Sequence, residues 1–464
     1  MKPEAPRLGV VLAGEILGDP AGRPARYIEL SETISQVDSE FVVIVEEGEL
    51  TAAELTNFAR AIELHPEADI LYADETVETA MGLHIVSKPV FSPERLRNQF
   101  YFGTVVVYRN SLLQAISGLR SQLEGAALYD LALRASRQAA SVVHIPEPLS
   151  SSIKGPRLGE VGVEDLENVR SALNEHLTAT GGGLVESVHL SGVHRTMRPV
   201  HGAPLVSIVI PTRGVWGFTG EHRFSLVLDA VTGVVKKSTY ENYEIVVVFD
   251  SVADPEVIES LRTVAGDRLR LIEWTHTFNF SSKINLGVVN SGGEYVLILN
   301  DDVQLITPDW IERMLALVQL PEAGMAGCML YYDDETIQHA GHHYWRGDAT
   351  HIGMFRDRTD SGPLNGYRVE REVRGVTAAC AMMPRDVFYA VGGMSSLLPG
   401  AFNDVDLCMK VTTAGYKIYW TPHAELYHFE SKTRDASVQK YEVDTAWGRW
   451  GSRMHDPRYW PYPS

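Results

Sequence analysis

Short apolar runs of strand length recur through residues 205–299, and a segment with helical periodicity follows most of them. The strongest runs cover residues 206–210, 243–249 and 295–299. Continuous apolar runs of this length are typical of strands buried on both faces. Strands that alternate with helices predict an α/β fold with a mainly parallel sheet, whose strand ends Thr212, Asp250 and Asp301 share one edge.

Residues 1–155 show a weaker form of the same alternation. Strands are predicted at 8–13, 39–45, 68–72 and 103–108, and helices at 51–64 and 129–137. Thr51 and Glu54 have the spacing of a capping box. Residues 156–203 are predicted to form a connector, with a helix at 163–178 and, after three glycines, a short hairpin or edge strands.

The two halves of the chain resemble each other. Residues 40–45 line up with 294–299, 129–134 with 405–410, and 144–146 with 419–422. The shared order and rough spacing favour a duplicated fold. The first copy is predicted to be shortened, because too little chain precedes Phe41 for a full nucleotide-binding half.

Composition narrows the class of protein. A chain of 464 residues predicts two or three domains. A formal net charge of -19 argues against nucleic-acid binding and against simple electrostatic docking on anionic lipid. No apolar run approaches the ~20 residues of a membrane span, and the first residues lack the apolar core of a signal peptide. Three cysteines without a CxxC pair favour a reducing cytoplasm.

Two segments offer chemistry for a phosphorylated ligand. Asn300, Asp301 and Asp302 follow a buried strand, where two carboxylates suit a divalent cation that holds a phosphate. A solvated turn explains the same residues. Lys283 and Asn285 lie in the first turns of a predicted helix, which is a place to bind a diphosphate or simply an ordinary Ser-capped helix.

Further candidates lie after residue 370. Thr377 and Ala378 belong to a run of small residues that allows close approach of a substrate, or tight packing. Asp404, with Asp406 nearby, has the position of a general base at a helix start. The bland alternative is an acidic first turn that complements the helix dipole behind Asn403 as N-cap.

Several histidines are also candidates. His428 gains weight as a ligand only if the fold returns it to Asp302. Histidines 339, 342, 343 and 351 surround Gly341. The spacing favours alternating strand faces that line a pocket wall, and a metal role is the second interpretation because no cysteine or carboxylate completes a zinc pattern.

Taken in order, these motifs resemble the family 2 inverting glycosyltransferases of the GT-A fold, especially rhamnosyltransferase-like enzymes of bacterial cell-surface polysaccharide synthesis. The matching segments are 206–212, 278–287, 300–302, 338–341, 375–379, 392–393, 403–407 and His428. The resemblance implies a catalytic GT-A domain over 204–434, preceded by a shortened, degenerate GT-A-like domain over 1–155. The connector lies between them, and a C-terminal helix and tail, expected to dock on the catalytic domain, cover 435–464.

The resemblance also implies roles for individual residues. Asp404 resembles the catalytic base, and Asp302 and His428 resemble ligands of Mn²⁺ or Mg²⁺. The implied donor-binding residues are Thr212, Asp250, Lys283, Asn285, Asn300 and Asp301, and the implied acceptor-side or supporting residues are Asp406, Thr377 and Ala378. The chain departs from the family pattern at Asn300, where the first acid of an Asp-x-Asp motif often stands.

The expected activity is inverting transfer of a sugar from a nucleoside diphosphate donor, with dTDP-rhamnose or a UDP-sugar as guesses. The expected acceptor is a glycan or lipid-linked glycan, at the inner face of the cell membrane. A non-catalytic glycan-binding module is the alternative. A nucleotidyltransferase is disfavoured, because residues 211–214 are too sparse for its glycine-rich basic loop.

The first copy is expected to lack the working groups. Glu46-Glu47-Gly48 stands where the second copy has its metal motif, and Leu128 stands in the place of Asp404. Ser150-Ser151 falls near the position of His428. We therefore expect this domain to bind acceptor or to act as a scaffold.

Overall fold

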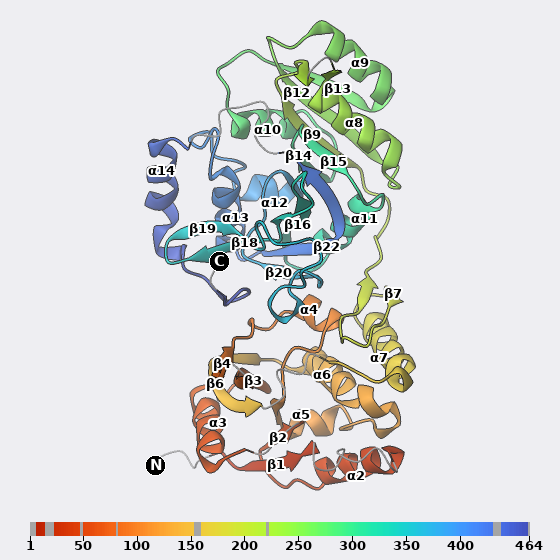
Figure 1. Cartoon of the computed structure of the whole chain (residues 1–464), viewed down its shortest axis with the longest axis vertical. Coiled ribbons are helices and arrows are strands. Elements are labelled where there is room, and N and C mark those ends of the chain that lie inside the picture. The colour runs from red at the N-terminus through yellow and green to blue at the C-terminus, as the bar shows by residue number, and fades with distance from the viewer. Residues whose placement is uncertain are drawn as a thin grey trace. The chain divides into compact units, whose positions relative to one another are not determined.

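The computed structural model describes residues 6–13, 23–46, 50–79, 82–152, 159–219, 222–429 and 438–462. The chain forms two compact units (Figure 1). Unit 1 consists of Met1–Pro199, Pro363–Val369 and Arg458–Tyr462, and unit 2 consists of Val200–Gly362, Glu370–Pro457 and Pro463–Ser464. No helix within the described ranges has the length and apolar character needed to cross a membrane.

Unit 2 is built on a ten-stranded mixed sheet. Its strands are β9 (Val206–Thr212), β12 (Tyr243–Asp250), β13 (Leu269–Trp274), β14 (Tyr295–Leu299), β15 (Val303–Leu305), β16 (Ala323–Tyr331), β17 (Ile337–His339), β20 (Arg371–Val373), β21 (Cys380–Pro384) and β22 (Lys417–His428). The main order is β13-β12-β9-β14-β21-β16-β22-β15. The first four strands are parallel, as the apolar runs predicted, and β21 is antiparallel to both its neighbours.

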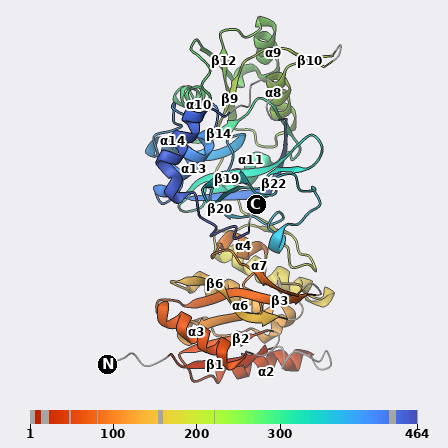
Figure 2. The same ribbon diagram turned by 60° about the vertical axis from the view of Figure 1, so that its left-hand side comes forward.

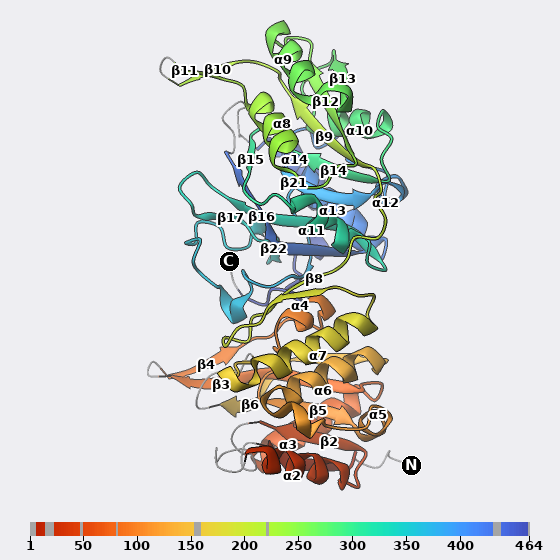
Figure 3. The same cartoon turned by 90° about the vertical axis from the view of Figure 1, so that its right-hand side faces the viewer.

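Helices cover both faces of this sheet. The helices of unit 2 are α8 (Leu226–Lys237), α9 (Pro255–Ala265), α10 (Phe280–Val289), α11 (Trp310–Val318), α12 (Arg385–Ala390), α13 (Asn403–Thr413) and α14 (Lys440–Trp450). Helices α8, α9 and α11 share one apolar core with Ile208 and Ile210 of β9 (Figure 3). Helix α10 lies on the opposite face, where Gly287 allows close contact with Val209 because a Cβ there would overlap its side chain.

Unit 1 has a smaller sheet of the same kind (Figure 2). Its strands are β1 (Leu8–Leu12), β2 (Phe41–Val45), β3 (Ile70–Thr79), β4 (Gly82–Val86), β5 (Val105–Arg109) and β6 (Val142–Ser152). Its helices are α2 (Arg23–Ser35), α3 (Ala52–Leu64), α4 (Pro93–Asn98), α5 (Asn110–Ala115), α6 (Ala127–Gln138) and α7 (Leu166–Ala179). Helix α3, which starts at the predicted Thr51 capping box, covers one face, and α2, α5, α6 and α7 cover the other.

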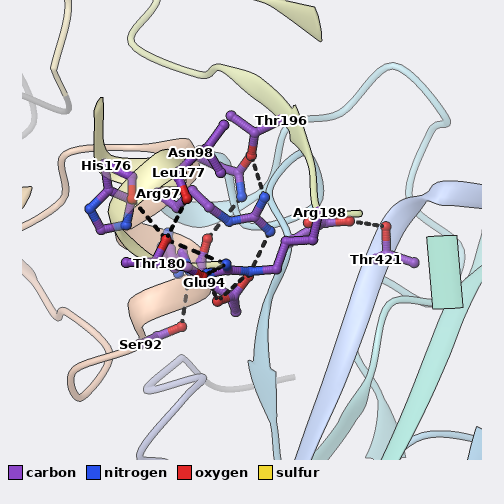
Figure 4. A network of polar contacts seen from close by, with 12 residues as sticks. Ser92, Glu94, Arg97, Asn98, His176, Leu177, Thr180, Thr196, Arg198 and Thr421 are labelled. Carbon is purple, nitrogen blue, oxygen red and sulfur yellow. Dashed lines mark hydrogen bonds and ion pairs between the residues drawn. The ribbon is translucent and has the colours of Figure 1, made fainter. Parts of the chain in front are cut away.

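The predicted connector packs within unit 1. It forms helix α7 and an antiparallel hairpin of β7 (Leu184–Ser187) and β8 (Arg195–Met197). Figure 4 shows a polar network that ties this segment to α4: Glu94 pairs with Arg97 and with Arg198, each at 2.6 Å. Burial alone would raise the pKa of Glu94, but the two guanidinium groups outweigh it and lower the pKa to about 2.

The sheets of the two units share one topology. The order β1-β2-β5-β3-β6 in unit 1 repeats β9-β14-β21-β16-β22 in unit 2, with the same parallel and antiparallel pairings. The register breaks at the same point in both, after Ala73 in β3 and after Cys328 in β16. Strands equivalent to β12 and β13 are absent from the described part of unit 1. The predicted shortened copy is therefore confirmed at the level of the fold.

A buried ion pair is also repeated. Asp130 and Arg134 of α6 pair at 2.7 Å, and Asp406 and Lys410 occupy the matching positions of α13, also at 2.7 Å. Asp406 is fully buried and also accepts hydrogen bonds from Arg449 and from Trp450 of α14. Because unit 1 keeps the pair in a copy without the other site residues, we infer that Asp406 holds its helix in place.

This inference predicts a matched effect of two substitutions. Asp130→Asn leaves the buried Arg134 without its carboxylate, and Asp406→Asn does the same to the half-buried Lys410, so each should destabilise its own unit by about 3 kcal/mol. Hydrogen exchange of the full chain, followed separately in α13 and α6, measures the two effects. Unchanged protection of α13 in Asp406→Asn would contradict a structural role for this carboxylate.

Candidate active site at the carboxyl edge of the unit 2 sheet

Three strand ends meet at one edge, as the sequence predicted. The Thr212 hydroxyl at the end of β9 donates to Asp301 Oδ2 at 2.6 Å. Lys283 Nζ, from α10, donates to the Thr212 carbonyl at 2.6 Å and to Asp250 Oδ1 at 2.7 Å. Strand β9 runs on through Pro211 to Thr212 rather than stopping at Ile210. This extension brings the Thr212 hydroxyl level with Asp301.

A pocket of about 200 Å³ opens beside Thr212 and Asp301. Its remaining lining residues are Arg213, Gly214, Val215, Trp216, Gly217, Phe224, Leu226 and Val227. The sequence analysis missed the hairpin of β10 (Gly217–Thr219) and β11 (His222–Phe224) at its rim. The guanidinium of Arg223 stacks 3.8 Å from the centre of the Trp216 ring, and aromatic residues at both ends of the segment were the available signal.

The carboxyl of Asp301 is strongly perturbed at this edge. Burial raises the pKa of its carboxyl to about 6, and the charge of Asp302 acts in the same direction. The hydrogen bond from Thr212 and the ammonium of Lys283 oppose this rise without cancelling it. An acid that is costly to ionise, next to a second carboxylate, forms a site that favours a nearby cation.

The fold returns His428 to Asp302. Strand β15 pairs with the end of β22, which places Val303 opposite His428, and His428 Nε2 lies 3.1 Å from Asp302 Oδ1. His428 Nδ1 lies 2.7 Å from Gln338 Oε1, an acceptor, so the lone pair of the neutral ring is on Nε2. The side-chain nitrogen of Asn300, Nδ2, is 3.0 Å from that same Nε2.

This arrangement fits a divalent cation. The Asn300 Oδ1 atom is buried and has no hydrogen-bond partner among the described residues. Asp302 and His428 offer carboxylate and imidazole donors, and the Asn300 oxygen would join them if its side-chain amide, whose nitrogen faces His428 Nε2, were turned over. Such donors suit Mn²⁺ and Mg²⁺. Asn300 thus has a neutral side chain where the family pattern often has an acid, and Gln338 orients the imidazole of His428 from behind.

Asp404 stands at the start of α13 with its side chain partly exposed, at 19%. Its Oδ1 accepts from the Val405 amide at 2.8 Å, and its Oδ2 lies 3.4 Å from the Ala378 amide nitrogen and 3.8 Å from His342 Nε2. The prediction of Asn403 as N-cap is wrong, because α13 begins at Asn403 and the cap is Phe402, whose φ is 56°. That left-handed turn aims the first turn of the helix at Ala378.

The small-residue segment joins Asp404 to the metal-side residues. The backbone amide of Asn300 donates to the Ala379 carbonyl at 2.9 Å. This carbonyl lies next to the backbone amide of Ala378, which faces Asp404. The Thr377 amide donates to His339 Nε2 at 3.2 Å. The predicted base and Asn300, which precedes the predicted ligand Asp302, thus contact a single backbone segment.

Helix α14 supports this arrangement from outside it. Glu442 Oε1 accepts from the amides of Gly400 and Ala401, both at 2.8 Å, in the loop that leads into α13. Arg449 and Trp450 bind Asp406, as described above. The C-terminal helix, predicted at 436–454, docks on the catalytic unit as expected, although its residues 436–437 lie outside the described ranges. The expectation is wrong for the tail, because Arg458–Tyr462 belong to unit 1.

Two residues that were predicted to bind the sugar donor make their hydrogen bonds within the protein. Both polar atoms of the Asn285 side chain bind the backbone of Met394, at 2.8 and 2.9 Å, so the structure does not bring this amide into the site. Lys283 lies at the site but is buried, and both of its contacts are with strand ends. Helix α10 is capped by Asn279 rather than by a serine.

Comparisons with known proteins identify the second unit. Residues 207–392 match the model of glycosyl transferase family 2. The second unit carries a family 2 glycosyl transferase domain. Together with the sheet order around β9 and β14, this match confirms the predicted GT-A fold.

Two relatives extend over most of the chain. An uncharacterised protein, y4gI, of Sinorhizobium fredii is 32% identical and covers 98% of this chain, which spans 53% of its length. The O-antigen biosynthesis protein RfbC of Myxococcus xanthus is 29% identical and covers 90% of this chain, which spans 33% of its length. The chain therefore spans about half the length of the first relative and a third of the second.

A solved structure, the mannosyltransferase PcManGT from Pyrobaculum calidifontis in complex with GDP-Man and Mn²⁺, is 16% identical. It covers 51% of this chain and 60% of its own, with a TM-score of 0.37. At that distance its ligands are no guide to those of this family 2 domain.

The matching edge of unit 1 is filled. Glu46 takes the place of Asn300, because its amide donates to the Thr104 carbonyl as that of Asn300 does to Ala379. A cavity of only about 10 Å³ remains there, lined by Glu46, Thr104 and Leu128 together with Ile44, Phe100, Gly103, Val106 and Tyr108. Glu47 and Gly48, the predicted replacements of the acids, lie outside the described residues.

The pKa of Asp301 predicts a pH dependence of stability. A raised folded-state pKa means that folding takes up a proton, so this contribution is present below about pH 4 and is lost as the pH rises through about 6. Asp301→Asn should remove the loss and stabilise metal-free unit 2 at pH 7 by at most about 3 kcal/mol.

Urea unfolding with a chelator present, between about pH 4 and pH 8, measures this difference. Asp267→Asn, which removes an exposed charge of the same unit, controls for the change in net charge. A stability difference between wild type and Asp301→Asn that is the same at both ends of this range would contradict the assignment.

Proposed function

We propose that unit 2 is a metal-dependent inverting glycosyltransferase. It moves a sugar from a nucleoside diphosphate donor to a hydroxyl of a glycan or lipid-linked glycan in cell-surface polysaccharide synthesis. The observation that carries the proposal is that the backbone at 378–379 contacts both Asp404, through the Ala378 amide, and Asn300, whose side chain contacts His428 beside Asp302. The family 2 match supports the reaction class, and the similarity to an O-antigen biosynthesis protein supports the pathway.

The donor lies along the edge of the parallel strands. The pocket of about 200 Å³ beside Thr212 receives the nucleoside, with Trp216 as an aromatic wall. Asp302 and His428, with the Asn300 amide oxygen, hold Mn²⁺ or Mg²⁺. When bound there, the cation supplies the positive charge that a leaving diphosphate requires. Lys283 orients Asp250 and the end of β9.

Asp404 acts as the general base. Its carboxylate takes the proton of the acceptor hydroxyl while that oxygen forms a bond to the anomeric carbon. The bond from this carbon to the diphosphate breaks at the opposite face, and the electron pair leaves with the diphosphate. One displacement inverts the anomeric configuration, and no covalent sugar–enzyme intermediate forms. The Ala378 amide holds Asp404 Oδ2 toward the reacting centre.

Unit 1 is a non-catalytic copy that contributes acceptor binding or scaffold. Three features support this: the described part of its sheet has no counterpart of β12 and β13, Leu128 replaces Asp404, and the matching cavity is about 10 Å³. The sugar and the nucleotide of the donor are to be identified by testing nucleotide sugars, with dTDP-rhamnose and UDP-sugars as the first candidates. The proposed location is the cytoplasm, at the inner face of the membrane.

The base assignment predicts a selective loss of transfer. Asp404→Asn should lower the rate of sugar transfer by at least about 100-fold while nucleoside diphosphate affinity with Mn²⁺ is retained. The rate is measured as the nucleoside diphosphate released and the sugar incorporated per unit time, across a panel of nucleotide sugars and glycan acceptors. Any unit 1 activity would appear as residual transfer in this variant.

Asp386→Asn is the matched control, because Asp386 also starts a helix of unit 2 and accepts from the amide of the next residue. It should leave transfer unchanged. Unimpaired transfer by Asp404→Asn would refute the base assignment. Tight sugar binding without release of nucleoside diphosphate from any donor would favour a glycan-binding module instead.

A further inference from the structure

A second group of possible metal ligands lies beside Asp404. His339 ends β17, and His342 and His351 face each other across the hairpin of β18 (His342–Trp345) and β19 (Asp348–His351). One ligand nitrogen from each ring lies within 4.8 Å of the others. His339 and His342 are buried, and His351 is half-buried, which gives the group a side open to solvent.

Two of the three rings already have the outer partners of metal ligands. His351 Nδ1 lies 3.2 Å from the Gln338 carbonyl, which only accepts, so the neutral ring has its lone pair on Nε2. His342 Nδ1 lies 3.2 Å from the Tyr344 hydroxyl. Metal-binding histidines usually donate their second N–H to such a carbonyl or to another oxygen, which fixes the tautomer.

His339 supplies an independent sign of a missing ligand. Its side chain is 1% exposed, and its Nδ1 has no hydrogen-bond partner among the described residues. An unpaired polar nitrogen at such a depth destabilises the fold unless a ligand satisfies it. The rings of His342 and His351 lie 5.3 and 4.7 Å from that of His339.

We propose that His339, His342 and His351 bind one transition-metal cation of the Zn²⁺ class, separately from the cation held by Asp302 and His428. Three imidazoles with an open fourth position form a donor set that suits zinc, whereas carboxylate and carbonyl oxygens suit Mg²⁺ and Mn²⁺. Binding at this site does not depend on the proposed transfer reaction.

Binding of a cation by the three histidines changes a contact of the small-residue segment that contains Thr377 and Ala378. The Thr377 amide donates to His339 Nε2 at 3.2 Å. A neutral imidazole that binds a cation through one nitrogen carries its proton on the other, so the cation displaces this hydrogen bond whichever nitrogen it uses. Zn²⁺ therefore loosens Thr377, one residue before the amide that holds Asp404.

Zinc titration of the full-length, metal-stripped protein tests the proposal. A chromophoric chelator competes for Zn²⁺, and Asp302→Asn serves as the background so that the other site is weakened. We expect one tight equivalent of Zn²⁺ per chain in this background. His351→Asn and His339→Asn should each weaken it at least tenfold.

His343→Asn is the matched control. His343 lies on the same strand as His342 and is equally buried, but it faces Trp345 and lies outside the cluster. Its substitution should leave the zinc affinity unchanged, and Zn²⁺ should raise the melting temperature of this variant but not that of His351→Asn. Melting of the metal-free variants shows whether each one folds.

Four results would overturn the proposal. The first is the absence of a tight equivalent of Zn²⁺, and the second is an affinity that His351→Asn and His339→Asn leave unchanged. The third is a Co²⁺-loaded wild-type protein whose visible spectrum shows only oxygen coordination, a measurement that needs no variant to fold. An equal loss in His343→Asn would likewise show that the three rings are not the ligands.

Discussion

The candidate site depends on one constraint, which is that parallel strands bring their polar carboxyl ends together at one edge. Asp301 and Asp302 would repel each other there if they were left alone. The Thr212 hydroxyl and the Lys283 ammonium oppose the cost of ionising Asp301, and His428 meets Asp302 from β22. The remaining imbalance, a pKa of Asp301 near 6, favours a cation at this edge.

Duplication shows which parts of the fold are structural and which belong to the site. Both copies keep the five-strand order, the break in register and the buried acid–base pair on the helix that follows. Among the described residues, only the second copy has strands such as β12 and β13 and an acid at the place of Asp404. The first copy fills the corresponding edge with Leu128 and Phe100. A copy that has to remain stable, but not to work as an enzyme, would keep the sheet and lose these residues.

Most of the fold could be predicted from apolar runs, because a continuous run such as 295–299 has few possible structures other than a buried strand. The position of His428 could not be read this way, since it depends on the pairing of β15 with β22 far along the chain. Asn285 was misleading because an amide at a helix start binds backbone as readily as it binds a diphosphate. The contacts of α14 depend on tertiary packing that no local pattern encodes, and the β10–β11 hairpin was signalled only by the aromatic residues at the ends of its segment.

Crystals of the full chain grown with Mn²⁺ and a nucleoside diphosphate, with anomalous data collected at the manganese edge, test the central claim most directly. The account predicts one strong anomalous peak within bonding distance of the Asp302 carboxylate and His428 Nε2, with the nucleoside in the pocket beside Thr212 and Trp216. A peak that is bound only by carboxylates elsewhere, or a nucleoside outside that pocket, would contradict it.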